Sequence, residues 1–203
     1  MLRKNFETIP LTGKWAEFMG IPEANGVMLV YGHSGNGKTS FLMQLAKELS
    51  KHGKVAYNTL EEGARYSMKQ AIITTGLDDS ADARKNFVIL DREPIAELKN
   101  RLRRHKSPKF VIIDSFQYTG LNKAEYIALK EEFKNKLFIF NSHADGKEPR
   151  GSVAQFVRYD ADVKIRVEGY KAFPTSRFGG GEPYVIWEKG AADYWMDIKT
   201  NES

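Results

Sequence analysis

The 203-residue sequence predicts an α/β fold in which helices flank a mostly parallel central sheet, with an antiparallel extension near the C-terminus. Uniformly apolar segments recur along the chain, separated by segments with helical spacing, at 27–31, 55–58, 87–90, 110–114 and 137–141. Strands that are apolar on both faces are typical of parallel sheets covered on both sides. The pattern changes after residue 152, where three strand-like segments and a run of three glycines predict the extension, at 163–167, 170–176 and 184–188.

The strand at 27–31 leads into a stretch that fits the phosphate-binding pattern G-x-x-x-x-G-K-[ST] at every fixed position. Its residues are Gly32, His33, Ser34, Gly35, Asn36, Gly37, Lys38 and Thr39. Apolar residues then recur at helical spacing from Phe41 to Leu49, and Gly53 is a natural stop for that helix. A strand, a glycine-rich loop and a helix in this order are the context that the pattern requires.

This motif predicts a site for ATP and Mg²⁺. Backbone N–H groups of the loop wrap the phosphates, and side chains at Gly35 and Gly37 would obstruct that wrapping. The helix that follows adds its N-terminal dipole and unpaired amides. We expect Lys38 to reach the outer phosphates, the Thr39 hydroxyl to take one position on Mg²⁺, and Ser40 to complete the nucleotide contacts.

The remaining elements follow in alternation. Helices are expected at 64–75, from Pro94 through the basic tract described below, at 123–133, and after Ser152 as a cap. Residues 78–86 are polar and predict a connection. Residues 1–25 predict an irregular extension of a single domain 1–203, with Trp15, Phe18, Met19 and Ile21 packed on the first strand.

Carboxylates follow two of the predicted strands, at the sheet edge where ligands of such folds bind. Asp114 ends an apolar strand, the usual place for the carboxylate that holds the water shell of a phosphate-bound Mg²⁺. Glu61 and Glu62 follow the second strand, which neighbours the first in many such sheets. We favour Glu61 as the base that activates water, with Glu62 as the alternative. Both could instead be helix N-terminal acids stabilised by the dipole.

Polar residues also close the fifth strand, in the order Asn141, Ser142 and His143. A side chain here is placed to sense the terminal phosphate and to pass its loss to the loop 144–151, which carries glycine, proline and charge. His143 could equally be a structural histidine. Arg177 follows the predicted strand 170–176. It could reach the phosphates of a neighbouring subunit, or it could be an ordinary surface arginine.

The chain has a modest excess of positive charge, part of it concentrated in one segment. Lysine and arginine number 31 against 26 acids, a net charge of +5 that permits an anionic partner without requiring one. Basic residues gather without an acid in the tract 99–109, which contains Lys99, Arg101, Arg103, Arg104, Lys106 and Lys109. This tract is either a solvated helix face or a nucleic-acid contact.

Two absences bear on location. There is no cysteine, which excludes disulfides and thiolate metal sites. No segment approaches the roughly 20 apolar residues of a membrane span, and residues 1–5 lack the apolar core of a signal peptide. We therefore expect a cytoplasmic protein with no membrane partner.

Taken together, these residues resemble the core of RecA-type P-loop ATPases, specifically RadA/Sms recombination ATPases and DnaB-type helicases. The resemblance is carried by the entry segment 18–26, by Leu60-Glu61-Glu62, by the strand 110–117, by Ser142-His143, by 150–152 with 160–162, and by Ser176-Arg177-Phe178-Gly179. It covers roughly residues 18–188 and implies a RecA-like P-loop NTPase fold, with ATP lying between the subunits of a homo-oligomeric ring or filament.

The resemblance also implies a role in DNA recombination, repair or replication, as in the minimal RecA-like ATPases of phages and mobile elements. Single-stranded DNA would then be contacted by the loop 144–151 and by the basic tract. Two departures are visible: Thr175 stands where the family has a lysine, and the segment 118–122 is short. The short segment favours a second hypothesis, a regulatory ATP switch with a protein partner. A third hypothesis is a motor core that needs a separate helicase or loader subunit.

Overall fold

The structure is a computed structural model that describes residues 5–201, of which residues 198–201 are described by their backbone alone. Residues 1–4 and 202–203, the ends of the predicted domain, lie outside the described residues. The strands are β1 (Gly26–Gly32), β2 (Val55–Thr59), β3 (Phe87–Asp91), β4 (Phe110–Asp114), β5 (Leu137–Asp145), β6 (Glu148–Pro149), β7 (Val163–Glu168), β8 (Lys171–Ser176) and β9 (Tyr184–Val185).

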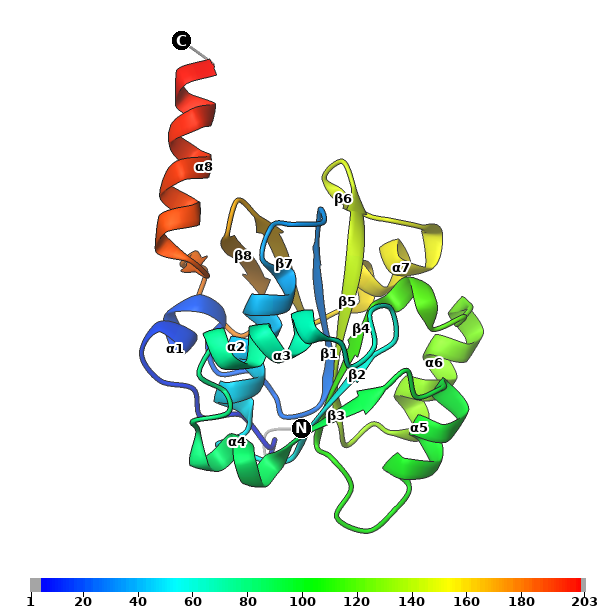
Figure 1. The fold of residues 1–203 in the computed structure, drawn as a ribbon. Helices are drawn as coiled ribbons and strands as arrows, with labels where there is room; N and C mark the ends of the chain where they lie inside the picture. Colours follow the sequence, from blue (N-terminus) through cyan, green and yellow to red (C-terminus); the bar gives the residue numbers. More distant parts are fainter. Residues whose placement is uncertain (1–4, 202–203) are drawn as a thin grey trace.

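Helices lie between these strands and at the C-terminal end (Figure 1). They are α1 (Lys14–Met19), α2 (Lys38–Leu49), α3 (Tyr66–Thr74), α4 (Ala81–Asn86), α5 (Ile95–Leu102), the short 3₁₀ helix η1 (Phe116–Tyr118), α6 (Lys123–Glu132), α7 (Ser152–Asp160) and α8 (Glu188–Asn201). None of the helices within 5–201 combines the length and the hydropathy needed to cross a bilayer.

The strands form one sheet in the order β3-β2-β4-β5-β1-β7-β8-β9, with β6 paired to β5. Pairing is parallel from β3 through to β7, and antiparallel between β7 and β8 and between β8 and β9. The predicted fold class is therefore confirmed, with one refinement. The segment at 163–167 belongs to the parallel part, because β7 pairs in parallel with β1.

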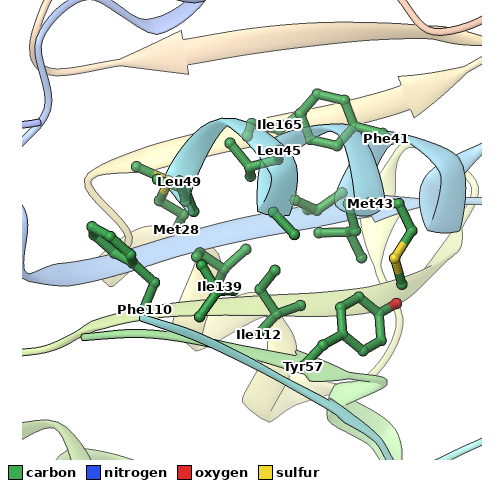
Figure 2. Close-up of a cluster of buried hydrophobic side chains, with 14 of the residues drawn as sticks. Met28, Phe41, Met43, Leu45, Leu49, Tyr57, Phe110, Ile112, Ile139 and Ile165 are labelled. Carbon is green, nitrogen blue, oxygen red and sulfur yellow. The ribbon is translucent and has the colours of Figure 1, made fainter. Parts of the chain in front are cut away.

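Two layers of helices bury the two faces of the sheet. Figure 2 shows α2 side chains such as Phe41, Leu45 and Leu49 lying over strand residues such as Ile112 and Ile139. The same cluster receives side chains from α1, α3 and α4. Helices α5, α6 and α7 pack on the opposite face. Both faces of each central strand are thus removed from water, which explains why these segments are apolar throughout.

The N-terminal segment packs on the α2 side of the sheet. Phe18 and Met19 of α1 are buried in that cluster, and Trp15 stacks on Tyr184 with ring centroids 4.6 Å apart. These three residues do pack against the core, but the ring contacts of Trp15 and Phe18 are to Phe41 of α2 and Tyr184 of β9 rather than to the first strand. The predicted irregular segment also contains a helix, α1. The prediction is wrong for Ile21, a residue that is 52% exposed.

Several predicted boundaries need correction. Residues 78–86 contain α4, which starts after Ser80, whose hydroxyl accepts a hydrogen bond from the Ala83 N–H. The helix through the basic tract stops at Leu102, so residues 103–109 form a loop. The predicted strand 184–188 ends at Val185, and Glu188 begins α8. Ser152 is the first residue of α7, whose N-cap is Gly151.

The predicted loop 144–151 also has more order than expected. Strand β5 continues to Asp145 and turns back into β6, with Ala144 opposite Pro149 and Asp145 opposite Glu148. We call residues 144–151 the hairpin. Figure 1 shows that it projects beyond the strands that flank it.

Candidate nucleotide-binding site

The carboxyl ends of the central strands converge on one pocket. Strand register places Thr59, Asp114, Asn141 and Val30 at one level across the sheet. The pocket has a volume of about 430 Å³. It is lined by Ser34, Gly35, Gly37, Lys38, Thr39, Ser40, Glu61, Glu62, Asp114, Asn141, His143 and Tyr170. Most of the predicted site residues therefore meet in one place.

Two glycines of the phosphate-binding loop lie too close to neighbouring residues to carry a side chain without rearrangement. A Cβ on Gly32 would lie 2.2 Å from the Val167 carbonyl oxygen, so only glycine lets β1 end against β7 here. Gly37 has a φ of 94° and would bring a Cβ within 3.2 Å of the Tyr170 ring. The side-chain oxygen of Asn36 accepts a hydrogen bond from the Gly169 N–H at 2.7 Å, which ties the loop to the β7–β8 turn.

Lys38 folds back onto its own loop. Its ammonium donates to the carbonyl oxygens of Gly32 and His33, both at 2.8 Å. Burial lowers the pKa of Lys38, while the charges of Asp114 and Glu61 oppose that shift. An ammonium bonded only to neutral carbonyls is free to exchange them for phosphate oxygens, which carry more charge.

Asp114 lies in the pocket with donors on both carboxylate oxygens. The Tyr57 hydroxyl donates to Oδ2, and the Asn141 amide donates to Oδ1 at 2.5 Å. Burial raises the pKa of Asp114, and these two hydrogen bonds oppose the shift. The two donors fix the plane of the carboxylate against its neighbours, so that its orientation toward the pocket is set before any ligand arrives.

The residues present fit a hydrated Mg²⁺. The side-chain oxygen of Asn141 is buried, belongs to a residue that lines the pocket, and has no hydrogen-bond partner among the described residues. A buried acceptor without a partner costs free energy that a donor such as a metal-bound water would recover. Thr39 and Asp114 would hold the ion together with phosphate oxygens, the arrangement that Mg²⁺ favours beside nucleotides.

Glu61 and His143 meet at the mouth of the pocket. The Nε2 atom of His143 lies 2.9 Å from a carboxylate oxygen of Glu61. Glu62 instead accepts from the Ser67 hydroxyl at 3.2 Å. Arg92 donates to the carbonyl oxygen of Glu62 at 2.9 Å and thereby anchors the loop that carries both acids. The geometry thus pairs Glu61, rather than Glu62, with a second polar group of the pocket.

A chain of hydrogen bonds through Gln117 connects His143 to the hairpin. The Gln117 side chain accepts from the His143 N–H at 3.2 Å and donates to the Ser142 hydroxyl at 2.7 Å and to the Arg150 carbonyl at 3.0 Å. The Arg150 N–H donates in turn to the His143 carbonyl at 2.8 Å. A shift of His143 would therefore be transmitted to both strands of the hairpin.

One sequence-based expectation about placement changes. Strand β2, which precedes Glu61, does not neighbour β1, because β4 and β5 lie between them. Glu61 still reaches the pocket, since the Leu60 N–H donates to the Asp114 carbonyl at 2.5 Å and draws the loop across β4. Arg177 lies at the other edge of the sheet, where it donates to Asp162 at 3.1 Å, and does not line the pocket.

Sequence reasoning missed three residues of the site. Tyr57 lies inside an apolar strand, Gln117 lies in η1 after β4, and Tyr170 lies in the β7–β8 turn. Of these three residues, only Tyr57 could have been inferred from the sequence. A tyrosine at a fully buried position needs a partner for its hydroxyl, and the aspartate that ends the adjacent apolar strand could have been proposed.

Comparisons with solved structures give the fold. Flagellar accessory protein FlaH from Methanocaldococcus jannaschii superposes with a TM-score of 0.59 at 17% identity, over 89% of this chain and 97% of that one. A KaiC-like protein, PH0186 from Pyrococcus horikoshii OT3, superposes with a TM-score of 0.63 at 18% identity, over 89% of this chain and 94% of that one. Both have the RecA-type P-loop fold, so the predicted RecA-like core is confirmed.

Comparisons of sequence reach less far. No protein-family model matches the chain. The 54 kDa signal recognition particle protein of Thermococcus gammatolerans is 31% identical over 133 residues. That match covers 63% of this chain and 28% of that protein, so this chain spans little more than a quarter of its curated relative.

Proposed function

We propose that this chain is a Mg²⁺-dependent ATPase. The observation that carries the proposal is the pairing of Glu61 with His143 over the pocket that also holds Lys38 and Asp114. A P-loop alone accounts for nucleotide binding. A carboxylate held by a second polar group beside it supplies the base that hydrolysis requires.

Each residue has a role in the proposed reaction. Lys38 leaves the carbonyls of Gly32 and His33 and donates to the outer phosphates of ATP. Bound Mg²⁺, held by Thr39 and Asp114, would offset charge on the phosphates. Glu61 accepts the proton of the attacking water, and the water oxygen bonds to the γ-phosphorus as the bond to the bridging oxygen of ADP breaks. His143 orients Glu61 and registers the departure of phosphate.

Three variants test this mechanism. Lys38→Ala should abolish hydrolysis, and unchanged turnover would refute the assignment of the nucleotide site. Glu61→Gln should retain binding of a fluorescent ATP analogue and lower kcat by at least about a hundredfold, the usual contribution of a general base. Glu62→Gln is the matched control, because it makes the same change on the adjacent residue. A loss confined to Glu62→Gln would reassign the base.

We further propose that turnover is coupled to a partner bound at the hairpin, and single-stranded DNA is the first candidate. The relay through Gln117 supports the coupling, and the exposed Lys147 and Arg150 supply positive charge for phosphates. The role would be in DNA recombination, repair or replication. ATP hydrolysis with and without single-stranded DNA, at low and moderate salt, tests it. Stimulation that fades with salt is expected.

A second candidate is a regulatory switch with a protein partner. The likeness to a flagellar accessory protein favours it, because that name describes a role outside DNA metabolism. Hydrolysis that depends on Lys38 but is indifferent to DNA at every salt concentration would support the switch and would count against the DNA-coupled role. The partner would then be sought by affinity capture with the Glu61→Gln variant in the presence of ATP.

We also propose that the chain acts as a homo-oligomer with ATP at the subunit interface. Arg177 supports this proposal, because it is 61% exposed and lies at the sheet edge opposite its own pocket. From there it could serve a neighbour's phosphates but not those of its own chain.

A further inference from the structure

A second hollow lies at the amino-terminal edge of the sheet, where the loop 103–109 joins α5 to β4. Figure 1 shows this loop at the lower end of the molecule, with the hairpin at the upper end. The hollow has a volume of about 520 Å³. Its wall carries five cationic side chains, Arg103, Arg104, Lys106, Lys109 and Lys136. We call this hollow the basic basin.

Lys136 is the unusual member of this set. The residue is only 7% exposed, and its ammonium donates to the Ser107 hydroxyl and to the Pro108 carbonyl, both at 2.8 Å. No carboxylate lies within ion-pair distance of it in the part of the chain that the structure describes. An ammonium has three N–H donors, so one remains. Charged groups this buried are normally paired.

Two features of its surroundings disfavour the charged form of Lys136. Burial and the neighbouring charge of Lys109 both lower the pKa of Lys136. An anion in the basic basin would oppose both effects, because it would take the remaining N–H and offset the repulsion.

Acids on the rim cancel only part of the charge. Glu132 accepts from Lys99 at 2.7 Å and from Arg103 at 2.5 Å, and Glu7 pairs with Lys109. Arg104 and Lys106 are exposed and have no carboxylate partner within the described residues. The basic tract is therefore part solvated ion pairs and part uncompensated charge. Three cations remain for a ligand: Arg104, Lys106 and Lys136.

The shape of the hollow favours a chain of phosphates over a small molecule. The hollow that these cations line is open to solvent, whereas an enclosed site would surround one anion. The only aromatic ring in the wall, that of Phe133, belongs to a residue that is 4% exposed, so there is no platform on which bases could stack. We propose that the basic basin binds the sugar–phosphate backbone of a nucleic-acid strand, independently of base sequence and at a site separate from the nucleotide pocket and the hairpin.

The test uses charge-removing substitutions at the two exposed cations, because a change at buried Lys136 risks the fold. In the double variant R104Q/K106N, asparagine is chosen at 106 because Lys106 has a φ of 59°, which asparagine tolerates. The matched control K69Q/K85Q removes two exposed lysines from α3 and α4. Binding of a fluorescein-labelled oligothymidylate is followed by anisotropy, without ATP, over a series of salt concentrations.

We expect R104Q/K106N to weaken binding at low salt by about tenfold or more, and K69Q/K85Q to leave it within about twofold. The slope of log K against log salt should become shallower by about 1.4, since each contact to a single-stranded phosphate contributes about 0.7. Equal affinities for the two variants would overturn the proposal. So would binding of polyglutamate in preference to the oligonucleotide.

A third variant separates this site from the proposed function. K147Q/R150Q removes the two cationic side chains of the hairpin, and it should abolish stimulation of hydrolysis by DNA while the basic basin still binds the strand. If K147Q/R150Q loses all binding and R104Q/K106N loses none, the basic basin is refuted and the hairpin role stands. Hydrolysis without DNA should be unchanged in R104Q/K106N, because neither residue touches the pocket.

Discussion

At the residue level, the proposed role of Asp114 and its burial favour different protonation states of the carboxyl group. The proposed Mg²⁺ site would need the carboxylate charged and fixed, but burial favours its neutral form and raises its pKa above the ordinary value of 3.8. Tyr57 and Asn141 offset part of that cost with hydrogen bonds. The proposed function thus favours a charged form that burial disfavours, as is common where function competes with stability.

Asp114→Asn should therefore stabilise the protein at neutral pH while abolishing hydrolysis. Because the folded pKa is raised, the folded state keeps the proton to higher pH than the unfolded chain does. The contribution of Asp114 to stability is present below the unfolded pKa and is lost as pH rises through the folded pKa. The advantage of the variant in the free energy of unfolding should grow over that window, by about 1.4 kcal/mol for each unit between the two pKa values.

Urea unfolding at a series of pH values upward from about 4 measures this difference. Asp160→Asn provides a control of opposite sign. Burial raises the pKa of Asp160, but hydrogen bonds from Lys130 and Tyr126 outweigh burial and leave the pKa lowered. Asp160→Asn should therefore become less stable relative to the parent protein as pH rises. An Asp114→Asn variant that is less stable than the parent at every pH would contradict the prediction.

Tyr57→Phe should impair the proposed Mg²⁺ site more than the fold. The variant keeps the ring in the core and removes only the donor to Asp114, a hydrogen bond to a charged group worth about 1.5–3 kcal/mol. We expect kcat/KM to fall by about tenfold or more, and the Mg²⁺ concentration for half-maximal hydrolysis to rise severalfold. Both follow from hydrolysis rates measured across a Mg²⁺ titration.

The matched control for Tyr57→Phe is Tyr126→Phe, which removes a buried tyrosine hydroxyl that donates to Asp160 at 2.5 Å away from the pocket. It should lower stability by a similar amount and leave the Mg²⁺ dependence unchanged. If both variants shift the Mg²⁺ dependence equally, Tyr57 acts only through overall stability.

At the scale of elements, the strands could be predicted more surely than the ends of the helices. Central strands are marked by apolar runs that few other elements share. The basic residues predict a helix through the whole tract, whereas the structure ends it at Leu102, because Pro108 disfavours helix at the residue before it and the chain turns at Lys106. Helix α4 is hard to predict because its cap at Ser80 precedes a short, mostly polar segment.

The hydrogen bonds of the Gln117 side chain connect η1 with β5 and with the chain after β6, and so link the pocket to the hairpin. Gln117→Leu keeps the size of the side chain and removes all three hydrogen bonds. ATP should slow hydrogen exchange of the 144–151 amides in the parent but not in this variant, with hydrolysis in the absence of partners retained within about threefold. Exchange followed by mass spectrometry measures it. Equal protection in both proteins would refute the relay.

At the scale of the whole molecule, the sheet puts Arg177 and Lys38 at opposite edges. If Arg177 serves a neighbour, Arg177→Ala and Lys38→Ala should each be inactive alone. Mixing them should restore hydrolysis, because an interface between one of each contains both residues. At equal concentrations, recovery of roughly a quarter of the parental rate is expected for random pairing.

A mixture of Lys38→Ala with Glu61→Gln is the control for the Arg177 experiment. Both residues act within one chain's pocket, so no mixed interface is complete and no recovery should occur. Recovery in this control, or its absence in the Arg177 mixture, would count against a role for Arg177 across the interface.

The local features of this protein follow from its sequence: the loop from Gly32 to Thr39, the apolar strands, and the polar residues that follow them. These depend on neighbours along the chain, where motif spacing and periodicity are informative. Three features could be known only from the three-dimensional structure: β4 and β5 separate β2 from β1, Tyr57 contacts Asp114, and Lys136 is buried with no carboxylate partner among the described residues. Those outcomes depend on long-range packing of two helical layers against the sheet, which no short stretch of sequence encodes.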